Sequence, residues 1–323
     1  MLVRMTGTAL ELHGIIKDFA VGGRSLRAVD GVDLQVGLGE TLGIVGESGC
    51  GKTTLARIML RLVRPSAGRI HLLGTDVTDL GEARMRPHRR LLQAVFQDPV
   101  SSLNPRMLVR DIIAEPLRAQ GACRRDRHHR AREMLERVGL PADAALRTPD
   151  AFSGGQRQRI AIARALAGDP RLVVCDEPTS ALDVSVQAQI LNLLADLQQR
   201  LGLSLVFVSH NLGAVRHVSH RVAVMYLGRI VEIGPEAVIF DAPAHPYTCA
   251  LLDAVPDPSP DIAPAPPLRG DVPSPLDRPA GCHFHPRCPR ADVRCASEDP
   301  PLRQCGDRHA VRCFHPWGPH ELH

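Results

Sequence analysis

The sequence predicts an α/β protein with a mostly parallel core sheet, an antiparallel β subdomain, a helical subdomain and a small cysteine-rich C-terminal extension. A glycine-rich phosphate-binding pattern follows an apolar strand at residues 41–45, and an Asp-Glu pair ends a second apolar strand at residues 172–177. Between them, a second glycine-rich turn opens a helix near residue 153. Strands alternating with helices favour a parallel sheet that binds ligands at its carboxyl edge.

Length and charge limit the classes of protein to consider. The chain has 323 residues, which exceeds one average domain, and its formal net charge is only +4. So small a net charge argues against strong electrostatic attraction to nucleic acid, and no nucleic-acid partner is expected. No run approaches eighteen apolar residues, and the N-terminus lacks the apolar stretch of a secretory signal. We expect a cytosolic chain, and any membrane role would depend on partner proteins.

Periodicity orders the elements along the first 243 residues. Near the N-terminus, Val32, Leu34 and Val36 alternate with polar residues, which predicts a half-buried strand of a small antiparallel sheet. A buried strand at 41–45 precedes the phosphate-binding pattern, and a helix is predicted over 52–62. Helical periodicity from about 98 to 167 predicts an inserted helical subdomain. Strand, helix and strand then return at 172–177, 184–201 and 203–208.

The composition changes after about residue 240. Residues 256–279 are rich in proline, which predicts an extended connector, and residues 282–313 are rich in cysteine. We therefore divide the chain into a domain at residues 1–243 and a C-terminal extension at residues 244–323.

The phosphate-binding loop matches the full G-x-x-x-x-G-K-[ST] pattern. Backbone N–H groups of such a loop face phosphates, Lys52 would reach the β- and γ-phosphates of ATP, and the Thr53 hydroxyl would ligate Mg²⁺. The strand before the loop and the helix after it favour this interpretation over a chance match. The predicted nucleotide-binding residues here are Gly46, Glu47, Ser48, Gly49, Cys50, Gly51, Lys52, Thr53 and Thr54.

Two carboxylates end the strand at 172–177. Asp176 would hold Mg²⁺, directly or through water, and Glu177 would orient or deprotonate the attacking water. A solvated acidic turn is the alternative. His210 follows the next strand and is a candidate sensor of the γ-phosphate, although a histidine considered alone is more often structural.

The glycine-rich turn near residue 153 is a second anion cradle. Ser153 can cap the helix, Gly154 and Gly155 allow close backbone approach, Gln156 follows, and the helix dipole favours a phosphate. One chain cannot easily fold both cradles around one nucleotide. The sequence therefore predicts composite sites shared by two subunits.

Together these motifs resemble the ATP-binding subunits of ABC transporters over almost the whole chain. In that family Ser153–Gln156 is similar to the signature motif, Gln97 to the Q-loop, residues 180–183 to the D-loop and His210 to the switch histidine. The resemblance implies ABC-type ATPase activity with Glu177, His210, Gln97 and Lys52 as catalytic residues, and Mg²⁺ held by Thr53, Gln97 and Asp176. It also implies that Phe19 stacks on adenine, with a core phenylalanine as the alternative.

Longer segments resemble the oligopeptide and dipeptide importer subgroup, namely residues 96–106, 224–228, 245–248 and 281–289. The resemblance implies an ATP-hydrolysing, energy-coupling subunit at the cytoplasmic face of the cell membrane, peripheral to it. Residues 101–106 are most similar to the second of two paired ATPase subunits. The implied partners are a sister ATPase in a head-to-tail heterodimer, two transmembrane permeases and an extracytoplasmic peptide-binding protein.

Two alternatives stand beside this interpretation. Relatives with such a tail also serve nickel or glutathione import. A soluble ABC-type ATPase of DNA repair or translation is the alternative from another class. Repair types insert long coiled coils and translation types carry two cassettes, and this sequence shows neither.

The C-terminal cysteines indicate a metal site. Cys282, Cys288, Cys295 and Cys313 cluster with Cys305 nearby, but their spacings match neither zinc pairs nor ferredoxin runs. The resemblance implies a [4Fe-4S] cluster on the first four, with zinc, or cysteines that merely pack, as alternatives. Elsewhere, Cys50, Cys123, Cys175 and Cys249 are scattered and are interpreted as ordinary small apolar residues. The alternative for Cys50 is that a helix N-terminus and Lys52 lower its pKa and make it sensitive to oxidation.

Overall fold

The computed structural model describes residues 7–98, 102–254 and 270–317. Its main sheet has eight strands in the order β11-β12-β10-β9-β3-β8-β7-β6. The last five strands in this order, from β9 to the edge strand β6, run parallel to one another, as the alternation of strands and helices predicted. These strands are β3 (Thr41–Val45), β6 (Leu92–Val95), β7 (Leu172–Asp176), β8 (Ser204–Val208) and β9 (Arg221–Tyr226).

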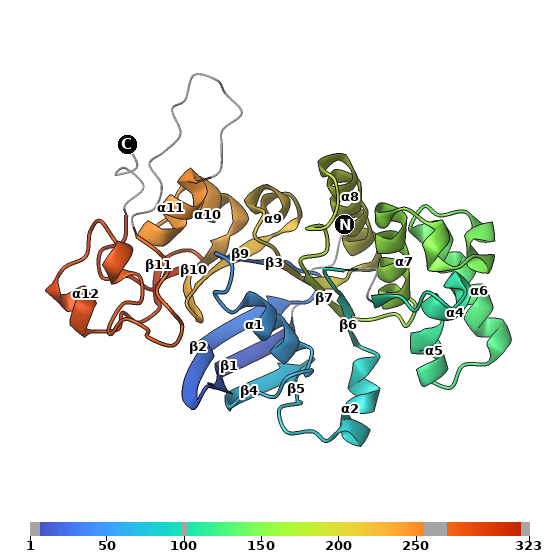
Figure 1. Ribbon diagram of the computed structural model, residues 1–323, viewed down its shortest axis with the longest axis horizontal. Coiled ribbons are helices and arrows are strands. Elements are labelled where there is room, and N and C mark those ends of the chain that lie inside the picture. The colour runs from blue at the N-terminus through green and yellow to red at the C-terminus, as the bar shows by residue number, and fades with distance from the viewer. Residues whose placement is uncertain (1–6, 99–101, 255–269, 318–323) are drawn as a thin grey trace.

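A second, four-stranded sheet of order β2-β1-β4-β5 lies below the main sheet in Figure 1. Its strands are antiparallel, which confirms the predicted β subdomain, and Val32, Leu34 and Val36 are buried on one face. Helix α1 (Lys52–Met59) ends three residues before the predicted limit, and its apolar side chains share a core with both sheets. The strands are β1 (Thr8–Val21), β2 (Arg24–Gly37), β4 (Ala67–Leu72) and β5 (Thr75–Asp76).

The helical subdomain lies at one end of the long axis of the molecule (Figure 1). Its described residues form helices and turns without a strand, as predicted for residues 98–167. Helix α2 (Glu82–Arg89) precedes it, and α8 (Val184–Leu201) packs against its last helix. The subdomain comprises α4 (Val109–Ile113), α5 (Glu115–Ala119), α6 (Arg124–Arg137), the 3₁₀ turns η1 (Ala142–Leu146) and η2 (Pro149–Ala151), and α7 (Gly154–Leu166).

The C-terminal part continues the main sheet at the opposite end of the molecule (Figure 1). Strand β10 (Arg229–Pro235) pairs antiparallel with β12 (His309–Val311), which pairs with β11 (Arg303–Gly306). Helix α9 (Leu212–Val218) packs against α8 and the core strand β3. The helical elements toward the C-terminal end are α10 (Glu236–Asp241), α11 (Pro246–Asp253), η3 (His285–Arg287) and α12 (Val293–Ser297). The cysteine-rich segment is therefore held to the core by β-sheet hydrogen bonds as well as by its covalent connection.

A buried carboxylate reinforces this junction. Glu232 on β10 is 0% exposed and accepts hydrogen bonds from the N–H groups of Ala244 (2.7 Å) and His245 (2.9 Å). Its other contact is with Nε2 of His309 at 2.7 Å. Burying a carboxylate without hydrogen-bond donors costs free energy. These contacts therefore stabilise residues 244–245 and β12 in their positions against β10.

Most of the predicted proline-rich connector, residues 255–269, lies outside the described residues. Its last residues pack against the β1–β2 hairpin, where Arg24 donates to the Leu276 carbonyl oxygen at 3.2 Å and pairs with Asp277. Within the described ranges, no helix is both long enough and apolar enough to cross a membrane.

Two neighbouring glycines at the start of α7 differ in how closely they approach α8. A Cβ atom at Gly155 would lie 2.4 Å from Cγ1 of Val186, whereas one at Gly154 would lie 3.4 Å from Cδ2 of Leu182. Only the contact at Gly155 is too short for a side chain. The absence of a Cβ atom at this position therefore sets how α7 and α8 meet.

We predict that Gly155→Ala lowers the free energy of unfolding by about 1–3 kcal/mol, because the added methyl group must displace Val186. Gly154→Ala is the matched control and should change it by less than about 1 kcal/mol, since alanine favours helices and meets only ordinary contacts. Urea unfolding followed by circular dichroism measures both values. Equal values for the two variants would contradict this account of the packing.

Candidate functional site

The predicted catalytic groups meet at the carboxyl edge of the main sheet. Strand β8 lies between β3 and β7, and Val208 at its end is in register with Ile44 and with Asp176. The segments that follow these three strands therefore emerge side by side. They carry the phosphate-binding loop, the Asp-Glu pair and His210, which the structure brings together as predicted.

The phosphate-binding loop depends on two glycines. Gly46 has φ 154° and Gly51 has φ 105°, both in the region that favours glycine. A Cβ atom at Gly46 would lie 2.1 Å from the carbonyl oxygen of Met225, and one at Gly51 would lie 2.3 Å from that of Ala28. Gly51 directly precedes α1, so the loop ends at the N-terminus of this helix. The free backbone N–H groups there favour the binding of anions.

Lys52 and Thr53 connect the loop to the carboxylates. The Lys52 ammonium is buried and donates to the carbonyl oxygens of Gly46 (2.7 Å) and Glu47 (2.9 Å). The Thr53 hydroxyl donates to Oδ1 of Asp176 at 3.3 Å. Burial raises the pKa of Asp176 despite this hydrogen bond, so a bound divalent cation would favour its charged form.

Glu177 occupies a constrained position next to His210. Its φ of 49° lies in the left-handed region, and its N–H donates to the carbonyl oxygen of Val208 at 2.9 Å. Oε1 of Glu177 is 3.2 Å from Nδ1 of His210. The carboxylate is mostly buried and the imidazole is more than half exposed. The two predicted catalytic groups are therefore within interaction distance.

One cavity joins most of the predicted nucleotide-binding residues. Phe19 at its rim is 36% exposed, so it is not a core phenylalanine. Of the predicted residues, the cavity is lined by Phe19, Ser48, Gly49, Cys50, Gly51, Lys52, Thr53, Thr54, Gln97 and Glu177. It is also lined by Leu26, Arg27, Ala28, Leu227, Gly228 and Pro275. None of these six was predicted to bind nucleotide, although Leu227 and Gly228 belong to the segment 224–228, and only the folded hairpins and the C-terminal part bring them here.

The burial of Cys50 agrees with its interpretation as an ordinary small apolar residue, and the alternative of an activated thiol was wrong. Its thiol is 3% exposed and lies 3.7 Å from Nζ of Lys52. Burial nevertheless outweighs the attraction of the ammonium group and raises the pKa of Cys50. The thiol is therefore protonated and shielded, not an activated thiolate.

The signature segment lies at the exposed start of α7, outside the cavity lining among the described residues. The N–H of Gln156 donates to Oγ of Ser153 at 3.4 Å, and Oε1 of Gln156 accepts from the Ser153 N–H at 3.0 Å. This capping box satisfies two N–H groups at the helix start. In the D-loop, the Ser180 hydroxyl donates to the Glu177 carbonyl oxygen at 3.1 Å.

The four cysteines predicted to bind metal line one pocket in the C-terminal part, with Phe284 and Phe314 among its walls. Burial raises the pKa of Cys282 to about 11 and that of Cys313 to about 12. Cys305 lies elsewhere, on β11. Among the described residues, the ligand atoms of Asp292, Cys295 and His315 form a group within 4.8 Å that the sequence did not predict.

Comparison with known proteins agrees with this geometry. The ABC transporter family matches residues 29–180, and the family described as oligopeptide/dipeptide transporter, C-terminal region, matches residues 231–295. A Sinorhizobium fredii protein named "Probable peptide ABC transporter ATP-binding protein" is 54% identical over 290 residues. That match covers 89% of this chain and 82% of the relative.

Solved structures share the fold of the ATPase part. A dimeric ATP-binding cassette in a post-hydrolysis state, bound to ADP and Pi, is 30% identical with a TM-score of 0.65 and covers 70% of this chain and 98% of its own. A Clostridium perfringens subunit, cbiO1 of the ABC transporter complex cbiONQ, is 25% identical with a TM-score of 0.66. It covers 73% of this chain and 92% of its own. This chain belongs to the ABC transporter family as an ATP-binding, ATP-hydrolysing subunit.

Proposed function

We propose that the chain is the energy-coupling ATPase of an importer for oligopeptides or dipeptides. The observation that carries the ATPase role is the convergence of Lys52, Thr53, Asp176, Glu177 and His210 at one sheet edge. The solute class is supported by the C-terminal region at residues 231–295 and by the name of the 54% identical relative.

The predicted site residues would divide between them the binding of ATP and its hydrolysis. Phe19 would stack on adenine, and the loop amides with Lys52 would bind the β- and γ-phosphates. Thr53, Asp176 and Gln97 would hold Mg²⁺, which supplies positive charge against the developing negative charge on the phosphates. Glu177 would orient the attacking water and accept its proton.

His210 would work next to Glu177. Its ring lies 3.2 Å from the carboxylate and is open to solvent on its other side. From there it can position Glu177 and approach the γ-phosphate, as proposed for a switch histidine. Its exposure leaves room for a neighbouring subunit.

The signature segment would complete the site of another ATPase subunit. Ser153–Gln156 begins an exposed helix N-terminus, capped by its own side chains, at a different position from the cavity of this chain. A related cassette of 30% identity forms a dimer with bound ADP and Pi. We infer a head-to-tail dimer, with a sister ATPase as the partner.

Permeases would bind beside the helical subdomain. A groove between α2 and α5 is lined by three arginines, together with Gln93 at the β6 strand that leads toward Gln97. The arginines are Arg86, Arg89 and Arg90. Glu82 also lines the groove and pairs with Arg89 at 3.3 Å. The groove therefore suits a polar cytoplasmic segment of a permease, and motion of the Gln97 segment could pass between the two proteins. We propose that the chain works at the cytoplasmic face of the membrane, with a peptide-binding protein on the other side.

We expect Glu177→Gln to retain MgATP binding and to lower turnover by roughly 10²–10⁴, because the amide cannot accept the proton of water. Glu236→Gln, on the surface of α10, is the matched control and should leave turnover unchanged. Steady-state phosphate release and equilibrium nucleotide binding measure the two effects. Normal hydrolysis by the assembled Glu177→Gln complex would contradict the role of Glu177.

Affinity purification of the tagged chain from detergent-solubilised membranes tests the transporter assignment. We expect a second ATPase and two permeases to copurify, and the associated binding protein to bind short peptides in a ligand screen. Recovery of ribosomes or DNA without a permease would instead support the soluble class of ABC ATPases.

We also propose that the cysteine pocket holds a [4Fe-4S] cluster on Cys282, Cys288, Cys295 and Cys313. The four thiols line one pocket, and burial opposes their ionisation unless a cation is bound. Each thiolate of such a cluster binds a different iron, so the sulfurs need not converge on one point. Among the described residues, the group of ligand atoms within 4.8 Å, Asp292, Cys295 and His315, includes only one of the four cysteines, so the four thiols do not already meet at the short spacing of a single zinc ion.

Anaerobically purified protein should contain about four iron atoms per chain and give an EPR signal on reduction, as expected for such a cluster. Cys313→Ser should lower the iron content, whereas Cys123→Ser, at an exposed thiol of the helical subdomain, should not. Zinc without iron in the wild-type protein would contradict the cluster.

A further inference from the structure

The C-terminal part of the chain contacts the phosphate-binding loop at Glu47. The Glu47 N–H donates to the Tyr247 hydroxyl at 2.9 Å. Its carboxylate accepts two hydrogen bonds from Arg287, at 2.9 Å from Nη1 and 3.1 Å from Nη2. Glu47 is thus held through its backbone by Tyr247, 200 residues later in the sequence, and through its side chain by Arg287, 240 residues later.

Arg287 and Tyr247 are themselves fixed. The Arg287 side chain is 5% exposed, and Nη1 also lies 3.4 Å from the Tyr226 hydroxyl. The rings of Tyr226, Tyr247 and Phe284 form a buried cluster with centroids 4.6–5.4 Å apart. A bidentate, charge-assisted pair in such surroundings has one preferred geometry. The contact therefore restricts where Glu47 can lie.

Glu47 transmits this restriction to the cavity. Its carbonyl oxygen accepts from Lys52 at 2.9 Å, and the following residues, 48–54, line the cavity. Glu47, whose N–H and carboxylate are bound by Tyr247 and Arg287, is not itself among the residues that line the cavity. The contacts with Tyr247 and Arg287 fix Glu47 at the start of the loop, while the backbone N–H groups of the later loop residues stay available for a ligand.

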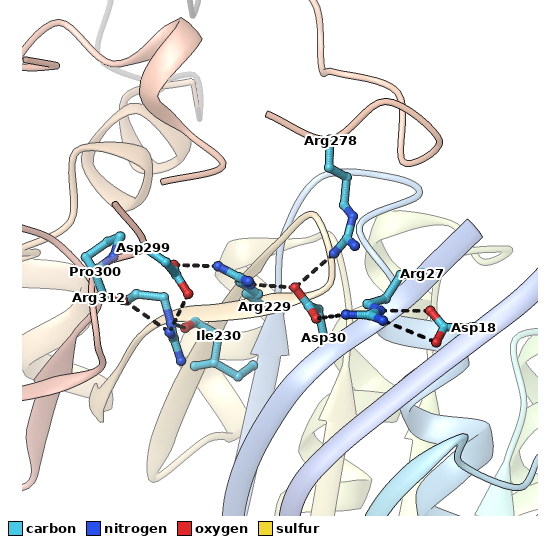
Figure 2. A network of polar contacts seen from close by, with 9 residues as sticks. All are labelled: Asp18, Arg27, Asp30, Arg229, Ile230, Arg278, Asp299, Pro300 and Arg312. Atoms are coloured by element: carbon cyan, nitrogen blue, oxygen red, sulfur yellow. Dashed lines mark hydrogen bonds and ion pairs between the residues drawn. The ribbon is translucent and has the colours of Figure 1, made fainter. Parts of the chain in front are cut away.

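A second contact lies at the opposite end of the cavity. Pro275 lines the cavity together with Phe19, and Arg278 donates to Asp30 at 2.9 Å. Asp30 belongs to a network of arginines and aspartates between the β1–β2 hairpin and the C-terminal part (Figure 2). Burial opposes the ionisation of Asp30, but Arg229 and Arg278 outweigh it and lower its pKa.

We propose that Arg287 and Tyr247 are positioning residues that preorganise the phosphate-binding loop, so that the C-terminal part sets the affinity for ATP. The proposal rests on the nucleotide site proposed above. A loop already held in its binding conformation loses less conformational entropy when a ligand binds. We call the contacts of Tyr247 and Arg287 with Glu47 the clamp. Because the clamp does not touch the attacking water, it should affect nucleotide affinity and KM more than kcat.

The test uses the full-length chain with Tyr247→Phe, Arg287→Gln, Arg287→Lys and Glu47→Gln. We expect Tyr247→Phe, Arg287→Gln and Glu47→Gln to weaken MgATP binding about tenfold in calorimetry, each having lost a contact to the loop. The KM for ATP should rise while kcat at saturation stays within about twofold. Arg287→Lys keeps the charge without the bidentate geometry and should be intermediate. Hydrogen exchange of the peptide spanning residues 46–54 should be faster in the weakened variants.

Two controls separate the clamp from general destabilisation. Tyr247→Phe keeps the aromatic ring and is therefore the mildest change in the core. Arg221→Gln removes a partly buried pair with Glu40 at 3.2 Å, away from the cavity lining, and should leave MgATP binding unchanged. Unchanged affinity in all the Glu47, Tyr247 and Arg287 variants, or an equal loss in Arg221→Gln, would overturn the clamp. Failure of the wild-type chain to bind MgATP would overturn the proposed nucleotide site itself.

Discussion

The parallel register of β3, β8 and β7 is the constraint on which the rest of the site depends. All residues of these three strands are buried, so their polar partners can appear only where the strands end. Because the strands are parallel, those ends share one edge of the sheet. Lys52, Asp176, Glu177 and His210 come from distant parts of the sequence and meet there without long loops.

Much of the fold and site could be predicted because local signals specify them. The loop motif, the apolar run before Asp176 and the alternation at Val32, Leu34 and Val36 each report on their immediate surroundings. The pairing of β12 with β10 and the contact of Arg287 with Glu47 could not be predicted this way, because they join segments without a shared pattern. Cys50 shows a further limit, since its pKa depends on burial that only the folded chain determines.

Some predictions remain predictions. The boundary between residues 243 and 244 stays a prediction, and so do the paired ATPase and the residues of the second subunit's site, which depend on another chain. The segment 96–106, which suggested the subgroup of importer, includes residues 99–101, outside the described residues. The buried Glu232 nevertheless gives a physical reason why the two predicted domains form one continuous sheet.

His245 links that carboxylate to the nucleotide site. Burial lowers the pKa of His245 to about 4, so its ring is neutral near pH 7, and Nδ1 can accept the N–H of Tyr247 at 3.0 Å. The histidine thereby caps α11, the helix that carries Tyr247 to Glu47. This arrangement also bears on synthesis. A ribosome that has just completed β8 and His210 has made every catalytic residue, but not Tyr247 or Arg287. The growing chain can hold Glu47 through these two contacts only after Tyr247 and Arg287 have also been made, so before that point we expect it to bind ATP more weakly.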